Sequence, residues 1–201
     1  LTRVLSVRSA LPDRARLQRE VQAARAKWPE PPPPGVVPQA PGPGQESVWD
    51  YPRPPLVRPC PVPVRIVFAG VTIAESRRAL EICETAGAPV PYIQPDDVDE
   101  DRLQPATGLS ICEWKGAAVY FDLKAAGRIS RRAAFAYPEP LDDLGCGFEA
   151  VAGWYGFYPG RVDEAWFGTE LASPQGGGVY AGWVTSRLAG PIKGEPGTGH
   201  W

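Results

Sequence analysis

The sequence predicts a mainly β protein, built from short antiparallel strands with one short helix among them. From residue 46 onward, apolar and polar residues alternate over short runs, which is the period of a strand with one buried face. Glycine and proline separate these runs at the spacing of hairpin turns. No internal repeat and no alternation of strands with long helices is visible, so a Rossmann-like sheet is not expected.

The first predicted hairpin and the predicted helix follow each other. Apolar residues alternate through residues 64–68, and Gly70 turns the chain into a second strand at residues 71–73. The segment from Glu75 to about Thr85 is then expected to be the short helix of the domain. Its apolar residues recur at helical spacing: Ala79, Leu80 and Cys83.

Two further strand pairs are predicted in the second half of the chain. Residues 119–123 alternate between apolar and polar, Gly127 turns the chain, and residues 129–137 return along it. Residues 153–158 and 162–167 are expected to form another pair of strands.

The N-terminal part of the chain differs in composition from the rest. Residues 1–28 are expected to hold a short, basic, amphipathic helix at the periphery of the protein. Its apolar stripe consists of Leu17, Val21, Ala24 and Trp28. Residues 29–45 are rich in proline and glycine and predict an unpacked linker, so the helix should be tethered rather than integral. Residues 46–201 are expected to form a single β-rich domain.

Bulk composition excludes several classes of function. The chain has 201 residues, 22% of them charged, and a formal net charge of -2. This charge gives no electrostatic case for nucleic acid as the main partner. No apolar run approaches the roughly 18 to 20 residues that span a bilayer, so no membrane partner is expected. No signal-peptide pattern precedes the four cysteines in this sequence, and we expect reduced thiols and a cytoplasmic protein.

The densest chemistry lies in Cys112-Glu113-Trp114-Lys115-Gly116, which is followed by Ala118 and Tyr120 and later by Phe135-Ala136-Tyr137-Pro138-Glu139-Pro140. This pattern resembles the signature of domain of unknown function 427, a bacterial and fungal family. The sequence departs from that signature at Phe135, where the family usually has tryptophan. The resemblance covers residues 46–201. It implies a β-tent-like (Mss4-like) fold, in which two antiparallel sheets meet at an angle, as in methionine sulfoxide reductase B and the drug-binding domain of cereblon.

The resemblance also carries a name that suggests nucleotidyl transfer, which needs two metal-binding carboxylates after a Gly-Ser turn. The acidic run at residues 96–101 has no Gly-Ser before it, so we expect a solvated turn there. No two cysteines lie within four residues of each other, and the single histidine is His200, so no zinc site is expected. We therefore expect neither a metal nor a nucleotide cofactor.

Lys115 is the strongest candidate for a functional group. Strand alternation would place Cys112 and Trp114 on one face and Glu113 and Lys115 on the other, with Gly116 permitting a close backbone approach. A lysine in a partly apolar site could donate to a carboxyl or carbonyl group, or act as a nucleophile if burial lowered its pKa. An exposed Glu-Lys pair is the simpler alternative. The candidate pocket residues are Glu84, Tyr92, Cys112, Trp114, Lys115, Tyr120, Phe135, Tyr137 and Tyr158.

Two functions remain after these exclusions. The favoured one is a cytoplasmic domain that binds a small molecule. Such a domain could be a binding protein or a metal-independent enzyme with a Lys/Glu/Tyr pocket. The alternative is a non-catalytic interaction or scaffold module. A concave pocket lined by Lys115, Glu84 and Tyr137 would support the first, and the same groups dispersed on a flat surface would support the second. The identity of the ligand and a homodimeric assembly are left open.

Overall fold

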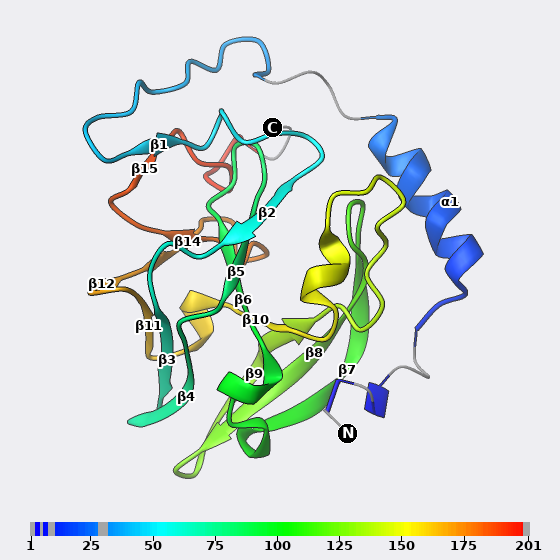
Figure 1. Cartoon of the computed structure of the whole chain (residues 1–201), viewed down its shortest axis with the longest axis vertical. Coiled ribbons are helices and arrows are strands. Elements are labelled where there is room, and N and C mark those ends of the chain that lie inside the picture. The colour runs from blue at the N-terminus through cyan, green and yellow to red at the C-terminus, as the bar shows by residue number, and fades with distance from the viewer. Residues whose placement is uncertain (1–2, 5, 8–10, 28–31, 199–201) are drawn as a thin grey trace.

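Two antiparallel sheets of different size form the centre of the molecule (Figure 1). The computed structural model describes residues 3–4, 6–7, 11–27 and 32–198. Within these residues the larger sheet has seven strands in the order β2-β5-β6-β10-β9-β8-β7, and the smaller has four in the order β12-β11-β3-β4. The larger sheet comprises β2 (Leu56–Pro59), β5 (Leu80–Cys83), β6 (Val90–Ile93), β7 (Leu103–Cys112), β8 (Gly116–Ala125), β9 (Arg128–Ala136) and β10 (Tyr155–Phe157). The smaller comprises β3 (Val64–Phe68), β4 (Val71–Ser76), β11 (Glu164–Phe167) and β12 (Glu170–Leu171).

Short elements complete the fold. The two short strand pairs are β1 (Glu46–Ser47) with β15 (Leu188–Ala189), in parallel, and β13 (Ser173–Pro174) with β14 (Trp183–Val184), antiparallel. Single 3-10 turns lie between strands: η2 (Pro95–Asp97), η3 (Glu100–Arg102), η4 (Phe148–Val151) and η5 (Pro159–Arg161). The mainly β, antiparallel architecture predicted from the sequence is thereby confirmed.

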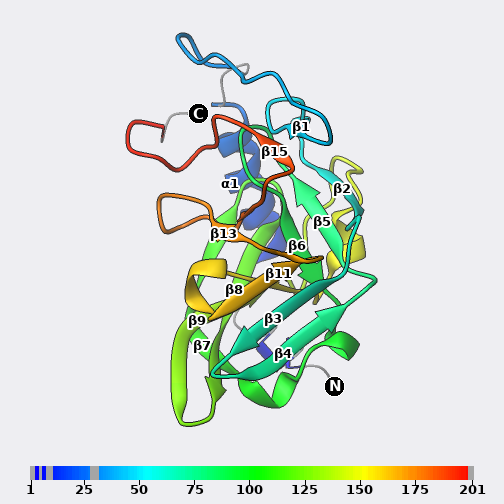
Figure 2. The same ribbon diagram turned by 90° about the vertical axis from the view of Figure 1, so that its left-hand side faces the viewer.

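The main core lies between the two sheets. Successive side chains of a strand point to opposite faces, and β8 directs Phe121 and Leu123 into this core, where they lie in one apolar cluster with Ile66 and Ile73 of the smaller sheet. In Figure 2 the smaller sheet lies in front of β8 and β9. The other face of β8 contributes to a separate cluster rich in tyrosine. Both faces of β8 are therefore covered, which is why nearly all of its residues are buried.

The predicted helix from Glu75 to Thr85 is wrong. This segment contains the end of β4 and the whole of β5, which pairs with β2 on one side and β6 on the other. The apolar spacing that suggested a helix also fits a strand that is buried on both faces, and pairing with two neighbours satisfies its backbone hydrogen bonds. Glu84 consequently follows a central strand.

The other expected strands are present, with one difference in pairing. The hairpins β3–β4 and β8–β9 confirm the predictions for residues 64–73 and 119–137. Strands also form within residues 153–158 and 162–167, but they do not pair with each other. β10 lies between β6 and β9, whereas β11 lies beside β3. The turn η5 separates them and carries the chain from one sheet to the other.

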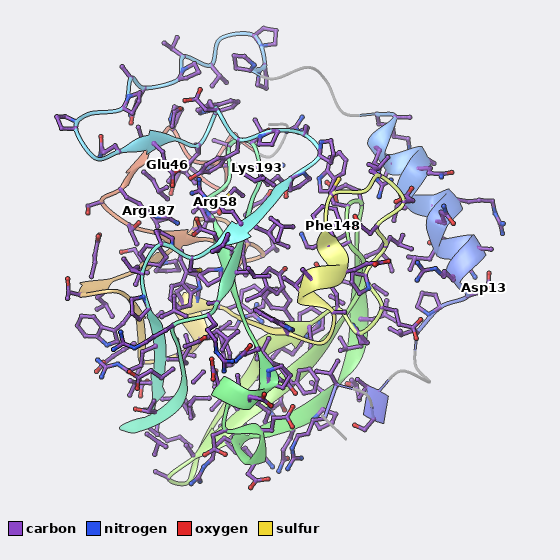
Figure 3. The ribbon with its side chains drawn as sticks, in the orientation of Figure 1. Asp13, Glu46, Arg58, Phe148, Arg187 and Lys193 are labelled. Carbon is purple, nitrogen blue, oxygen red and sulfur yellow. The ribbon has the colours of Figure 1, made fainter. Side chains whose placement is uncertain are left out.

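A buried ionic network joins the first strands to the C-terminal part of the chain. Glu81, fully buried on β5, accepts from Arg58 Nε at 2.7 Å and from Arg187 Nη2 at 2.6 Å. The same two arginines bind Glu46 of β1 at 2.6 and 2.9 Å. Figure 3 labels Glu46, Arg58 and Arg187 beside one another. Each buried charge thus has partners of opposite sign, which offsets the cost of removing it from water.

Helix α1 (Arg14–Arg25) lies along the right side of the molecule in Figure 1, beside the segment that follows β9. Asp13 caps it by accepting from the amide of Arg16 at 2.9 Å. Leu17 and Val21 are buried against Ala117 and Leu141, so the helix packs on the domain, in contrast to the expectation that it would only be tethered. Trp28, also expected on its apolar stripe, lies outside the described residues. No helix among the described residues is long and apolar enough to cross a membrane.

Candidate functional site

A cavity of about 520 Å³ lies on the tyrosine-rich face of the larger sheet, opposite the face that packs on the smaller sheet. All of the predicted pocket residues except Trp114 line it. They are Glu84, Tyr92, Cys112, Lys115, Tyr120, Phe135, Tyr137 and Tyr158. Strands β6 to β9 supply half of these side chains, because alternate residues of neighbouring strands share one face of a sheet, and the other half lie just beyond strand ends.

Aromatic rings form the floor of the cavity. Phe135 lies at its centre, with ring centroids 5.9 Å from Tyr92, 6.1 Å from Tyr137 and 5.3 Å from Tyr158. Gly156 of β10 lies directly beneath this ring, and a Cβ atom there would be 2.4 Å from Phe135 Cζ. The absence of a side chain at Gly156 therefore lets the Phe135 ring lie flat against the sheet.

Polar groups border this aromatic floor. The hydroxyl groups of Tyr120 and Ser110 share a hydrogen bond of 2.7 Å, and the guanidinium of Arg132 lies 3.7 Å from the centre of the Tyr120 ring. Burial raises the pKa of Tyr92 and that of Tyr137 above the ordinary value for tyrosine. Both phenols are therefore neutral near pH 7 and can donate a hydrogen bond to a ligand.

Lys115 reaches the cavity because it lies in a turn. β7 ends at Cys112 and β8 begins at Gly116, so Glu113, Trp114 and Lys115 form the hairpin turn between them. The strand alternation that separated Lys115 from Cys112 therefore does not apply, and both side chains line the same cavity. Gly116 has φ +84°, which favours glycine and explains how the chain enters β8 so abruptly.

The Lys115 side chain is largely buried, and its ammonium lies near aromatic rings. The residue is 7% exposed, and among the described residues it makes no hydrogen bond or ion pair. Its Nζ atom lies 5.4 Å from the ring centre of Tyr137 and 5.9 Å from that of Phe148, a residue labelled in Figure 3. These distances are those of cation–π contacts, so aromatic rings partly stabilise the charge of Lys115.

Burial lowers the pKa of Lys115, but acidic groups around it outweigh burial and raise its pKa above the ordinary value. These groups are Cys112, Tyr92, Glu84 and Glu113. Lys115 is therefore a cation at neutral pH. A raised pKa favours an ammonium that donates hydrogen bonds over a neutral amine that attacks a carbonyl group.

Trp114 lies behind the cavity rather than in it. Its indole Nε1 donates to Glu84 Oε1 at 3.4 Å, and its ring is buried in the tyrosine-rich cluster. Burial raises the pKa of Glu84, whereas the charge of Lys115 lowers it, and burial is the larger effect. Trp114 thus donates to a carboxyl group that lines the cavity together with Lys115.

The C-terminal part of the chain supplies a wall that the sequence did not reveal as part of the site. Val179, Tyr180, Ala181 and Lys193 line the cavity. This segment packs on the domain, since Lys193 N donates to Ala86 O at 2.7 Å and Gln175 Nε2 donates to Lys193 O at 2.8 Å. The Lys193 ammonium, labelled in Figure 3, lies 5.6 Å from the Tyr180 ring, and burial lowers its pKa. Its rarity, as one of four lysines, was the available signal.

The acidic run at residues 96–101 divides its carboxylates among separate partners. Asp97 binds Arg78 at 3.1 Å, Asp99 binds Arg102 at 3.3 Å, and Glu100 accepts from Tyr155 at 2.6 Å. No group of three metal-binding side chains forms within the described part of the chain. His200 lies outside that part.

Comparison with known proteins gives one match. A family model described as a domain of unknown function (DUF427), with the short name NTP_transf_9, matches residues 56–168, more than half of the chain. No curated protein matches the sequence. The matched segment contains the aromatic floor and the Lys115 turn, whereas α1 and Lys193 lie outside it. The chain belongs to the DUF427 family.

Proposed function

We propose that this protein binds a small organic molecule in the tyrosine-lined cavity. The ligand presents a carboxylate or carbonyl oxygen to Lys115 and an apolar body to the rings around Phe135. The observation that carries the proposal is the buried, cationic Lys115, which lines a cavity and has no hydrogen bond or ion pair among the described residues.

A buried ammonium is unfavourable unless its donors are satisfied. Acidic groups around Lys115, the Cys112 thiol first among them, raise its pKa, but no carboxyl group lies within ion-pair distance of it in the described part of the chain. A ligand oxygen inside the cavity would accept a hydrogen bond from Lys115. Because Lys115 is cationic, the proposed role is donation to the ligand rather than formation of an imine. Whether bound ligand is also transformed, in a metal-independent reaction, is a question for product analysis of the same mixtures.

The concave arrangement supports this function over an interaction or scaffold module. Lys115, Glu84 and Tyr137 line one cavity of about 520 Å³, which is a volume typical of small-molecule sites. A second cavity of about 70 Å³ shares Glu84, Lys115 and Lys193 with the first. Two lysines and one carboxyl group thus converge on the same hollow.

The test compares Lys115→Ala with Lys124→Ala, which changes a lysine of β8 that does not line the cavity. We expect Lys115→Ala to change the free energy of unfolding by less than about 1 kcal/mol, because burial disfavours the charge of Lys115 whereas the acidic groups around it favour that charge. It should abolish binding of aromatic carboxylates such as 2-naphthoate, while Lys124→Ala binds as wild type does. Calorimetric titration measures the binding, and aromatic aldehydes serve as the comparison ligands.

Retained binding in Lys115→Ala would remove Lys115 from the site. A loss of about 3 to 5 kcal/mol of stability would instead identify a structural ion pair. If reduction traps an aldehyde covalently on Lys115, then Lys115 forms an imine with the ligand instead of donating a hydrogen bond to it.

The remaining expectations are part of the same proposal. The packing of a larger on a smaller antiparallel sheet supports a β-tent-like (Mss4-like) arrangement. The net charge of -2 supports a protein that acts on small molecules rather than on nucleic acid or membranes. A cytoplasmic location and a homodimer stay predictions, which fractionation of cells and light scattering of the purified protein would test.

A further inference from the structure

Helix α1 contacts the turn that carries Lys115, although the helix lies outside the segment matched by the family model. Its last residue, Arg25, donates from Nε to the carbonyl oxygen of Glu113 at 2.6 Å and from Nη2 to that of Trp114 at 3.1 Å. The same guanidinium binds Asp143 Oδ2 and Oδ1 from Nη1 at 2.9 and 3.1 Å. One side chain therefore fixes two consecutive carbonyl groups of the turn and joins them to the loop after β9.

These contacts lead directly to the charged groups of the cavity. The Arg25 side chain is 11% exposed and lies 5.4 Å from the centre of the Trp114 ring. Trp114 in turn donates to Glu84, and Lys115 is the next residue along the turn. Displacement of the turn would therefore move both Lys115 and the donor that holds Glu84.

Apolar side chains of α1 and of the loop after β9 also pack against the same turn. A Cβ atom on Gly116 would lie 3.2 Å from Leu17 Cδ2 of α1 and 3.0 Å from Leu141 Cγ. The amide of Leu141 donates to the carbonyl oxygen of Lys115 at 3.0 Å. The carbonyl groups of all three turn residues are thus bound by groups outside the hairpin, two of them by α1. The position of Lys115 therefore depends on α1 and on the loop after β9 as well as on the hairpin itself.

We propose that Arg25 is a positioning residue for the cavity, and that α1 is a functional part of the site rather than an appendage. The proposal rests on the proposed function, since the position of Lys115 matters to a ligand that binds there. Arginine suits this role because its planar fork holds several N–H donors in fixed directions, toward two carbonyl groups and a carboxylate, whereas the lysine ammonium is a compact point charge on a flexible stem.

The experiment follows Lys115 in full-length protein labelled with [13Cε]lysine. The chain has four lysines, so four signals are expected, and Lys→Arg variants assign them. In Arg25→Ala the Lys115 signal should shift and its pKa should fall toward that of an ordinary lysine, while the Lys124 signal stays unchanged. The affinity for 2-naphthoate should weaken about tenfold or more, because small displacements of a binding group are costly.

The matched control is Arg19→Ala, which removes an exposed arginine from the same helix. It should leave the Lys115 signal and the affinity unchanged. Arg25→Lys keeps the charge and the helix but not the fork, and it should shift the Lys115 signal as Arg25→Ala does.

An unchanged Lys115 signal in folded Arg25→Ala, whatever its melting temperature, would overturn the proposal and leave Arg25 a purely structural contact. If Arg25→Ala does not fold, an unchanged signal in Arg25→Lys overturns it equally. A shifted signal in a protein whose wild type binds no carboxylate would support positioning by Arg25 and refute the proposed ligand class. The two proposals can therefore fail separately.

Discussion

The two faces of the larger sheet are made by the same strands but differ in what they offer. Toward the smaller sheet, β8 presents Phe121 and Leu123 to a core of aliphatic and aromatic side chains. Toward the cavity, the same strand presents Ala118 and Tyr120 among tyrosines, a lysine and a carboxyl group. One face is closely packed, and the other is hollow.

The difference shows how a single sheet separates stability from chemistry. Close packing of apolar groups stabilises the fold in proportion to the area removed from water. A hollow lined by polar tips adds less to stability, but it leaves donors and a cation accessible to a ligand. Substitutions on the packed face should therefore lower stability, and substitutions on the hollow face should mainly change binding.

The largest effect is expected for Phe121→Ala, which should lower the free energy of unfolding by about 3 to 5 kcal/mol. Phe121 is fully buried, and its ring lies 5.3 Å from that of Tyr155. Urea denaturation measures the change. Tyr120→Phe, one residue away on the other face, removes a single hydroxyl bound to Ser110 and should cost less than about 1.5 kcal/mol. Equal losses in the two variants would contradict the separation of the faces.

Gly156→Ala should have an intermediate effect, on the order of 1 to 3 kcal/mol, because the new methyl group would displace the Phe135 ring. The displaced ring would enter the cavity, so binding of 2-naphthoate should weaken in the same variant. Gly160→Ala is the control, since its Cβ atom would meet Pro174 at an ordinary 3.4 Å. Unfolding midpoints and calorimetric titration measure the two effects. Wild-type binding by Gly156→Ala would show that the Phe135 ring is not part of the ligand-binding floor.

The smallest effect concerns pH. Burial raises the pKa of Asp122, but donation from the Arg132 amide and the Arg131 guanidinium outweighs burial and holds that pKa below its ordinary value. A lowered folded-state pKa contributes stability above the unfolded value of about 3.9, and this contribution is lost as the pH falls below it. Asp122→Asn should therefore be about 1 to 2 kcal/mol less stable than wild type at pH 7, with a smaller difference below about pH 4.

Asp101→Asn, at a side chain that is 94% exposed, serves as the control and should parallel wild type throughout. Denaturant titrations between about pH 3 and pH 7 span the range in which an ordinary aspartate changes charge. A constant difference between Asp122→Asn and wild type over this range would contradict the lowered pKa.

Much of the fold was predictable wherever the information was local. The hairpins at β3–β4 and β8–β9 follow from alternation and from a glycine at each turn. The segment that contains β5 was not predictable from its own residues, because the spacing of Leu80 and Cys83 fits a helix as well as a buried strand. Its pairing with β2 and β6 decides the outcome, and a single sequence does not reveal that pairing.

The candidate site was also predictable in part, where a local motif identified its residues. The residues from Cys112 to Tyr158 were grouped by their motif and their aromatic character, and they line one cavity. Alternation failed at Lys115 because the chain turns there, a change for which Gly116 was the available signal. Lys193 was missed because it is far along the chain, and its place depends on hydrogen bonds to Ala86 and Gln175.

The parallel pair of β1 and β15 has a consequence for the order of folding. It joins Glu46 to Leu188, and the ionic network around Glu81 closes over the same junction. Closing so long a loop costs more chain entropy than forming the neighbouring β7–β8–β9 hairpins, so we expect the hairpins to form first. Lys115 would then stay in contact with water until the segment with Lys193 docks as the last wall. Pulse-labelled hydrogen exchange during refolding, with late protection at residues 188–193, would reveal this order of assembly.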